Sequence, residues 1–356
     1  MARADLSALG RTLIIVNPTA RNGAAAKAAD RLQRFLTLYC HRDAFDVAQT
    51  EHPRHATKIA AQAYGYDTVL ALGGDGVVHE IANGLMQIKT GKRPTLGVVP
   101  VGSGNDFART LGLTDIDGIR DGNFYTVLGG EPATIDLMRI DWENRDTDPH
   151  MGDEDAKDDI DDRLGLRSCA DTALARQQQG SLFAVQTFSM GLDAAIALGT
   201  HDLRKKISLT GMPLYMASAM NALGRDYRCF DSIAAFDGDG PKRLRTITIA
   251  VQNGPTYGSG FQICPDADPS DGLLDICYAA GPVSRAIALP VFLSAKNGSH
   301  VGNKHIRIQR ARKVSLAFTH EGYPIQVDGE RLDATSVTIQ VAPAALKILK
   351  PARTKS

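Results

Sequence analysis

The chain has 356 residues, of which 43% are hydrophobic and 22% charged, a composition that is typical of a folded globular protein. Lysine plus arginine and aspartate plus glutamate number 40 each, so no net charge draws the chain to nucleic acid, and no such partner is expected. Five cysteines without a C-x-x-C pair argue against a disulfide framework or a zinc site and predict a reducing, cytoplasmic setting.

Strand and helix patterns alternate through the first third of the chain. Apolar runs predict strands over Leu13–Val16, Phe45–Thr50, Thr68–Leu72 and Leu96–Val99. Helical spacing predicts helices over Gly23–Tyr39, Thr57–Tyr64 and Val77–Met86. Strands separated by helices predict a parallel sheet, and turns that follow its strands lie at the carboxyl edge, where open α/β sheets bind ligands.

Strand patterns dominate after about residue 134. They cover Thr134–Ile140, Leu182–Phe188, Ser232–Phe236, Thr246–Val251, Leu274–Tyr278, Val314–Phe318, Pro324–Val327 and Val337–Val341. One long helix is predicted over Leu203–Leu223 and a shorter one over Ser284–Ala295. Residues 143–180 are acidic and poor in large apolar side chains, which predicts a disordered insertion.

The predicted fold class is therefore a three-layer α/β domain with a parallel sheet, followed by a mainly antiparallel β-sandwich domain. The first domain spans residues 1–134, with 342–356 as a candidate addition, and the second spans 135–341. No segment approaches the roughly 20 apolar residues that cross a bilayer, so any membrane contact is expected to be peripheral.

A first glycine loop, Gly73-Gly74-Asp75-Gly76, follows the third predicted strand and opens a helix. Glycines let the backbone come close to a ligand, and N–H groups at a helix start suit phosphate oxygens. Asp75 could hold Mg²⁺ there, while Glu80 and Asn83, one turn apart on the helix, are expected to brace the loop. Taken alone, the motif is as consistent with a bare turn.

A second glycine loop, Gly102-Ser103-Gly104, follows the fourth predicted strand in the same way. Asn105 or Asp106 is expected to cap the next helix, and Ser103 and Arg109 to reach a phosphate. Together with Asn17-Pro18 after the first strand, three loops then share one edge of one sheet. This convergence favours a nucleotide phosphate site over unrelated turns.

These three segments, with His79-Glu80 and the run Gly102 to Ala108, resemble the diacylglycerol kinase catalytic domain family and, more narrowly, its soluble bacterial lipid kinases. The resemblance spans about Thr12 to Val341 apart from the acidic insertion. It implies ATP and Mg²⁺ as cofactors, a lipid hydroxyl as acceptor, and an active site between the two domains. The residues expected at the nucleotide are Asn17, Pro18, Thr19, Arg21, Thr50, Gly73, Gly74, Asp75, Gly76, His79, Glu80, Gly102, Ser103 and Asn105.

The resemblance also implies roles for acidic residues in the later part of the chain. Asp75 and Asp136 would arrange the phosphates and catalytic magnesium, and Asp268, Asp271 and Leu273 would hold a structural Mg²⁺, partly through backbone carbonyls. A carboxylate of Asp328-Gly329-Glu330 would accept the proton of the acceptor hydroxyl, with Asp328 the favoured one of the two. Asp-Gly is equally a strong hairpin signal.

One departure and several alternatives accompany this interpretation. Arg21 stands where relatives commonly carry a lysine, which puts the detailed geometry of the first loop in doubt. Basic clusters at 204–206 and 304–313 are either membrane-facing or ordinary solvated surface. The expected partner is a membrane lipid at the inner face of the membrane, most simply diacylglycerol, and a homodimer is a default. Ceramide or sphingoid acceptors, an NAD kinase-like enzyme and a non-catalytic nucleotide-binding regulator are the alternatives.

Overall fold

The computed structural model describes residues 6–39, 44–113, 124–144, 179–207, 211–225, 227–319 and 322–351. The predicted acidic insertion lies almost entirely outside these residues. None of the helices in the described part has the length and hydropathy that a membrane crossing requires.

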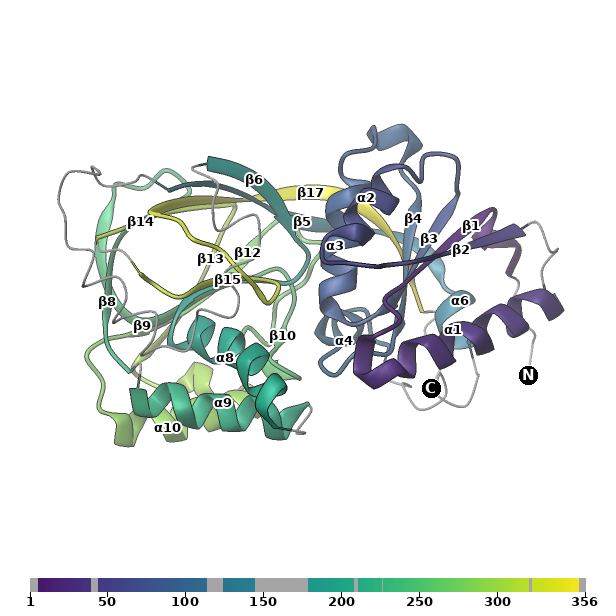
Figure 1. Cartoon of the computed structure of the whole chain (residues 1–356). Coiled ribbons are helices and arrows are strands. Elements are labelled where there is room, and N and C mark those ends of the chain that lie inside the picture. The colour runs from purple at the N-terminus through teal and green to yellow at the C-terminus, as the bar shows by residue number, and fades with distance from the viewer. Residues whose placement is uncertain are drawn as a thin grey trace, which may run out of the picture.

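The N-terminal domain contains a parallel sheet in the order β2-β1-β3-β4. Its strands are β1 (Thr12–Val16), β2 (Phe45–Gln49), β3 (Thr68–Gly73) and β4 (Thr95–Pro100). Its helices are α1 (Ala20–Tyr39), α2 (His55–Ala61), α3 (Asp75–Leu85), α4 (Asp106–Thr110) and α6 (Tyr125–Leu128), with 3₁₀ turns η1 (Leu6–Leu9) and η3 (Thr90–Lys92). Helices α2 and α3 pack together on one face and α1 covers the other, which gives three layers (Figure 1).

The second domain is a mainly antiparallel sandwich. Its strands are β5 (Glu131–Glu143), β6 (Gln179–Ala184), β7 (Thr187–Gly191), β8 (Phe230–Phe236), β9 (Lys242–Gln252), β10 (Thr256–Tyr257), β11 (Phe261–Gln262), β12 (Leu274–Ala280), β13 (Ile306–Ala311), β14 (Lys313–Phe318), β15 (Ile325–Val327), β16 (Glu330–Arg331) and β17 (Ser336–Lys350). Its helices are α8 (Leu192–Lys206), α9 (Met212–Arg225) and α10 (Arg285–Ser294), followed by η5 (Ala295–Asn297) and η6 (Ser299–Gly302).

The helices of this domain lie along one side of the sandwich (Figure 1). Side chains of successive residues in a strand point to opposite faces of the sheet. Strand β9 therefore contributes side chains to two hydrophobic cores. Ile249 and Val251 enter the core between the sheets, whereas Ala250 enters a second core beneath α8 and α9. The two predicted domain types are thus both present.

Strand β17 links the domains. It pairs with β5 along nearly its whole length, and its end reaches the parallel sheet, where Ile348 lies opposite Leu96 of β4. Leu346, Ile348 and Leu349 are buried in the core of the first domain. The expected boundary at residue 134 falls inside β5, so one continuous sheet runs through both domains.

Two element predictions are wrong. The helix expected over 203–223 is two helices, because α8 already begins at Leu192 and α9 starts anew just after Gly211, with Pro213 in its first turn. The strand expected over 182–188 is also two, β6 and β7, because the chain changes neighbours at Val185 and Gln186. This second break matters for the site described next.

Candidate active site

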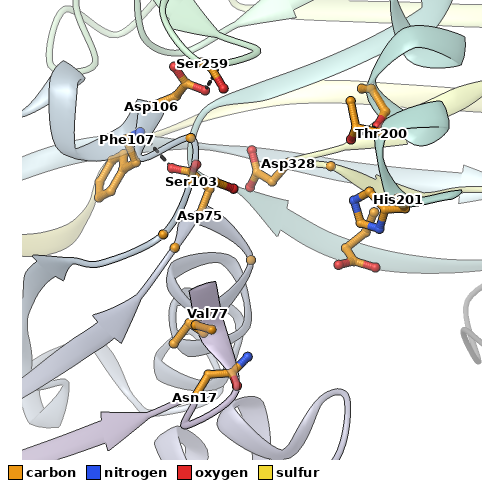
Figure 2. Close-up of a pocket in the computed structure, with 18 of the residues that line it drawn as sticks. Asn17, Asp75, Val77, Ser103, Asp106, Phe107, Thr200, His201, Ser259 and Asp328 are labelled. Atoms are coloured by element: carbon orange, nitrogen blue, oxygen red, sulfur yellow. Dashed lines mark hydrogen bonds between the residues drawn. The ribbon is translucent and has the colours of Figure 1, made fainter. Parts of the chain in front are cut away.

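A cleft of about 580 Å³ lies between the domains, at the carboxyl edge of the parallel sheet. Loops after β1, β3 and β4 line one side, and parts of the second domain line the other. Figure 2 shows Asn17, Asp75 and Ser103 from the first domain and Thr200, His201 and Asp328 from the second around this space. The size lies within the range of cavities that hold small ligands.

The two glycine loops touch each other. The carbonyl oxygen of Gly73 accepts hydrogen bonds from the N–H groups of Val101 and Gly102, at 2.9 and 3.2 Å. A Cβ atom on Gly102 would lie 2.4 Å from the Cα of Gly74, so only glycine permits this approach. The backbones of the two loops therefore form one continuous surface on this side of the cleft.

Asp75 joins these loops through its carboxylate. Oδ1 accepts a hydrogen bond of 3.0 Å from the N–H group of Phe107, in the first turn of α4 (Figure 2). Sequence reasoning assigned the cap of α4 to Asn105 or Asp106, but Asn105 instead closes its own loop through both polar atoms of its side chain on Gly102. Burial raises the pKa of Asp75, the hydrogen bond from Phe107 opposes this, and the Asp328 charge adds to the rise.

The first loop presents a compact polar turn. Asn17 Oδ1 accepts hydrogen bonds from both the N–H and the hydroxyl of Thr19, at 3.1 and 2.8 Å. Thr19, Arg21 and Thr50 line the cleft beside Asn17. Arg21 lies in the first turn of α1 with a φ of 50°. The positively charged side chain of Arg21 therefore lies near the N-terminus of α1, on the same side of the cleft as the glycine loops.

Glu80 lines the cleft but braces a different loop from the expected one. Its two carboxylate oxygens accept hydrogen bonds from the N–H groups of Arg54 and Ala56, at 3.0 and 3.1 Å. It therefore caps α2 from α3. Asn83, one turn later, bonds to the backbone of Phe183 in β6 and so fastens α3 to the second domain.

Asp106 crosses the domain interface. Its carboxylate accepts hydrogen bonds from the N–H groups of Ser259 and Gly260, at 2.8 and 2.7 Å (Figure 2). Burial and the neighbouring Asp75 charge raise the pKa of Asp106 to about 6. Arg109, expected at a phosphate, instead donates to the Gly104 carbonyl and to Asp106, so it stabilises the second loop.

The Asp328-Gly329 pair is both a hairpin turn and part of the site. Both residues have positive φ, 48° and 94°, as a tight turn between β15 and β16 requires. The Asp328 carboxylate is buried and accepts hydrogen bonds from the N–H groups of Val185, Gln186 and Thr187, at 2.8 to 3.0 Å. The break between β6 and β7 frees these backbone donors for Asp328.

A fourth donor to Asp328 comes from the other domain. His79 Nδ1 lies 2.8 Å from Asp328 Oδ2, and both side chains are almost fully buried. Burial alone would lower the pKa of His79, but the hydrogen bond and charge of Asp328 raise it above its usual value. Glu330, on the same turn, lines the cleft, and no hydrogen bond to its carboxylate is found among the described residues.

Several residues expected at the nucleotide do not line the cleft. Gly73, His79 and Asn105 are buried outside it, and half-buried Pro18 does not line it either. Asp136 is also absent from the wall, because its buried carboxylate accepts hydrogen bonds from the N–H groups of Gly272 and Ala344. Asp136 therefore ties the 268–273 loop to β17, and its expected part in arranging the phosphates and magnesium stays a prediction.

The loop expected to hold a structural Mg²⁺ is arranged differently. Asp268 binds the backbone and hydroxyl of Ser270, while Asp271 pairs with the guanidinium of Arg310. Arg310 also lies 3.2 Å from Asp275, so a cation already stands between two of the carboxylates. No cluster of three acidic, His or Cys ligands occurs among the described residues. The guanidinium of Arg310 therefore competes for this position, and the structural Mg²⁺ expected from Asp268, Asp271 and Leu273, partly through backbone carbonyls, stays a prediction.

A phosphate-bound Mg²⁺ fits the cleft better. Mg²⁺ is usually held by one or two carboxylates together with substrate phosphates. The charge of Asp328 contributes to the raised pKa of Asp75, the charge of Asp75 contributes to that of Asp106, and a divalent cation at Asp75 would relieve this repulsion. Both carboxylate oxygens of Asp106 and of Asp328 accept backbone hydrogen bonds, whereas Asp75 Oδ2 accepts none in the described part of the chain, so Asp75 is the residue that would hold the ion.

Sequence reasoning missed most of the second-domain wall. Gln186, Thr200, His201, Tyr215 and Tyr257 line the cleft, from elements that the sequence analysis did not connect with it. Arg204 was assigned to a surface basic cluster, but its guanidinium lies 3.2 Å from the Ser103 hydroxyl across the cleft. Three of these six residues lie on helix α8. The Ala- and Leu-rich spacing at its start is the signal from which this helix could have been predicted.

The fold and the cleft define a two-domain phosphotransferase in which glycine loops of an α/β domain face acidic residues of a β-sandwich. Residues 11–140 match the family model of the diacylglycerol kinase catalytic domain, and residues 186–350 match that of the YegS C-terminal NAD kinase beta sandwich-like domain. The chain belongs to the bacterial diacylglycerol kinase and YegS-like lipid kinase family.

Individual relatives agree along the whole chain. It is 29% identical over 347 residues to a Mycobacterium tuberculosis protein named "Diacylglycerol kinase", covering 96% of each. It is 27% identical over 340 residues to the Xanthomonas oryzae pv. oryzae "Probable lipid kinase YegS-like", covering 93% of this chain and 94% of that one. The crystal structure of a diacylglycerol kinase from Bacillus anthracis superposes with a TM-score of 0.62 at 17% identity, covering 96% and 97% of the chains.

Proposed function

We propose that the protein transfers the γ-phosphate of ATP to the free hydroxyl of diacylglycerol, giving phosphatidic acid. The observation that carries this proposal is the meeting of two touching glycine loops with the Asp328–Glu330 turn across one cleft. The naming of the M. tuberculosis relative, which matches over nearly the whole chain, supports diacylglycerol as the acceptor.

The phosphate groups would lie on the glycine loops. Gly74 to Val77 and Gly102 to Gly104 line the cleft there, and glycine-rich turns at the start of a helix suit phosphate oxygens. Arg21 and Arg204 approach from opposite sides and would neutralise negative charge, with Arg204 already on the Ser103 hydroxyl. Mg²⁺ held at Asp75 would neutralise the remaining phosphate charge.

Glu330 is the better-placed proton acceptor of the two candidates. A carboxylate offers about four lone-pair positions, and Asp328 uses all of them on three backbone N–H groups and His79. Glu330 faces the same cleft without such partners among the described residues. Asp328 would then fix the turn, and Glu330 would take the hydroxyl proton as the oxygen attacks phosphorus.

A lipid-panel assay with radiolabelled Mg-ATP tests the function. Purified protein is offered dioleoylglycerol, ceramide and sphingosine in mixed micelles, and NAD in solution. We expect rapid phosphorylation of dioleoylglycerol alone, abolished in Asp75→Ala. Preferential labelling of ceramide, sphingosine or NAD would refute diacylglycerol as the substrate.

We propose that the surface formed by α10, η6 and β13 contacts the membrane. Exposed apolar side chains gather there, with Ile287, Leu293 and Val301 each more than 40% exposed. Helix α10 packs on η6 and η6 on β13, and exposed Lys304 lies between η6 and β13 at the end of this surface. Of the two basic clusters at 204–206 and 304–313, Arg204 faces the cleft and Arg310 pairs with Asp271, so neither residue belongs to this surface.

Vesicle co-sedimentation tests this surface. A basic residue near an anionic bilayer contributes about 1 kcal/mol, so Lys304→Ala should bind phosphatidylserine vesicles about fivefold more weakly. Ile287→Glu should weaken binding to neutral and anionic vesicles alike. Ile233→Glu, at an exposed apolar position of β8, is the matched control. Equal sedimentation of all variants would exclude this surface.

A further inference from the structure

A second cavity, of about 90 Å³, lies in the sandwich domain beneath α10. Strands β9 and β12 form its floor, with Ile247, Ala250 and Ala279. Helix α10 forms its cover, with Ala288 and Phe292. The wall is almost entirely apolar, unlike that of the cleft between the domains.

The cover is held weakly. None of the ten residues of α10 is buried, although the helix is rich in Ile, Leu, Val and Phe. Ala288 and Phe292 face the cavity, whereas Ile287 and Leu293 are exposed to solvent. A helix with apolar side chains on both sides and little buried area costs little to displace.

The cavity and the cleft share a wall. Tyr257 of β10 lines both spaces. Tyr215 of α9 lines the cleft, stacks near Phe261 and Phe292, and feels the charges of both Asp193 and Asp106. A single layer of side chains, which includes Tyr257, therefore separates the cleft from the apolar cavity.

A buried carboxyl group stands in the cavity wall. Asp193, in the first turn of α8, is 5% exposed, and neither of its carboxyl oxygens has a hydrogen-bond partner among the residues that the structure describes. Burial raises its pKa to about 7, and the nearby Ser189 hydroxyl offsets only a part of this rise without a hydrogen bond of normal geometry. An unpartnered buried carboxyl group is costly to maintain, which suggests that a ligand group completes its hydrogen bonding.

We propose that this cavity takes an acyl chain of the acceptor lipid, which passes Tyr257 from the cleft, so that the ester group of the chain lies beside Asp193 while the free hydroxyl stays in the cleft. The inference rests on the proposed function and extends it to the place of the lipid. Cavities of about 150 Å³ hold a benzene ring, so the present space admits only the start of a chain, and α10 must move outward to admit more. The membrane-facing position of α10 allows the bilayer to assist that movement.

Filling the cavity tests the proposal. Ala288→Phe places a ring in the cavity from α10, and Ala286→Phe adds the same ring to an exposed position of the same helix. We expect Ala288→Phe to raise the KM for dioleoylglycerol roughly tenfold or more while the KM for ATP and for dibutyrylglycerol stays within twofold. Ala286→Phe should match the wild type. Equal KM values for dioleoylglycerol in both variants would overturn the proposal.

Two further measurements keep the test decisive. Ala279→Phe fills the same cavity from β12 and should reproduce the effect if Ala288→Phe does not fold. Fluorescence titration with NBD-labelled dioleoylglycerol reports binding without turnover. Loss of binding in the filled variants alone supports the cavity even if no lipid is phosphorylated, which would refute only the proposed reaction. Unchanged binding in every variant would refute the cavity.

Discussion

His79 Nδ1 lies 2.8 Å from Asp328 Oδ2, so a helix of the nucleotide-side domain holds the acidic turn of the opposite domain. We expect this contact to position the turn rather than to take part in proton transfer. His79→Ala leaves a buried carboxylate one donor short, which costs about 1.5 to 3 kcal/mol. It should lower kcat about tenfold to a hundredfold with little change in the KM for ATP, measured by initial rates.

Substitution of the two acidic residues separates position from chemistry. Loss of a general base lowers rates by about 10² to 10⁴, so Glu330→Gln should fall in that range with unchanged thermal stability. Asp328→Asn should lower both activity and melting temperature, because it disturbs three backbone contacts. Gln87→Ala, exposed on α3's C-terminal side, is the control. A fully active Glu330→Gln enzyme would return the base role to Asp328.

Gly102 tests whether contact between the loops matters for nucleotide binding. A Cβ atom there would lie 2.4 Å from Gly74 Cα, so Gly102→Ala must push the two loops apart. We expect the KM for ATP to rise at least about tenfold, while the KM for lipid changes little. Gly91→Ala, where a Cβ atom meets nothing within 4 Å, is the matched control. Equal KM values for ATP would show that the loops do not cradle phosphate.

The sequence predicted the layout of the first domain well because its signals are local. Apolar runs followed at once by Gly-rich turns fix strand ends such as Gly73, and parallel order then places the loops at one edge. The signal for the hairpin turn at Asp328-Gly329 is also local, because two successive residues with positive φ favour an Asp-Gly pair.

The unpredicted parts depend on contacts between distant segments. Nothing near Asp75 announces that its carboxylate caps a helix 32 positions later, nor near Asp136 that its oxygens bind Gly272 and Ala344. The contribution of α8 to the cleft wall could not be predicted for a related reason. The predicted helix begins eleven residues after the first residue of α8, so Arg204 was expected at the surface of the protein. Side-chain hydrogen bonds to remote backbone leave no periodic trace in a sequence.

Arg310 provides a test of how the 268–273 loop is stabilised. Because its guanidinium pairs with Asp271 and lies 3.2 Å from Asp275, Arg310→Ala leaves two carboxylates facing each other. We expect a loss of about 1 to 2 kcal/mol, seen as a melting temperature a few degrees lower. Arg312→Ala, exposed nearby, should change nothing.

The same loop should be insensitive to chelation. Removal of divalent ions with EDTA, without nucleotide, should leave the melting temperature of the wild type within about one degree. A fall as large as that of Arg310→Ala would mean that a bound metal ion, and not the guanidinium, stabilises the loop.

Asp193 should make stability depend on pH in a defined direction. Its pKa is raised to about 7 in the folded chain by burial, against about 3.9 when unfolded, so the native state binds the extra proton between these values. The contribution of Asp193 to the free energy of unfolding therefore decreases as the pH rises from about 4 to 7. The other groups that face it, Tyr215 on α9 and Cys277 on β12, have raised pKa values and stay neutral in this range.

Asp193→Asn removes this titration while keeping the shape of the side chain. The free energy of unfolding of the variant, relative to wild type, should increase by roughly 2 to 3 kcal/mol between pH 5 and pH 8. Urea unfolding at both pH values measures it, with Asp266→Asn, at an exposed carboxylate, as control. Acidic groups elsewhere, such as Asp106, shift both proteins alike and cancel in the difference. A difference that does not change with pH would mean that Asp193 is charged in the folded protein and has a partner that balances its burial.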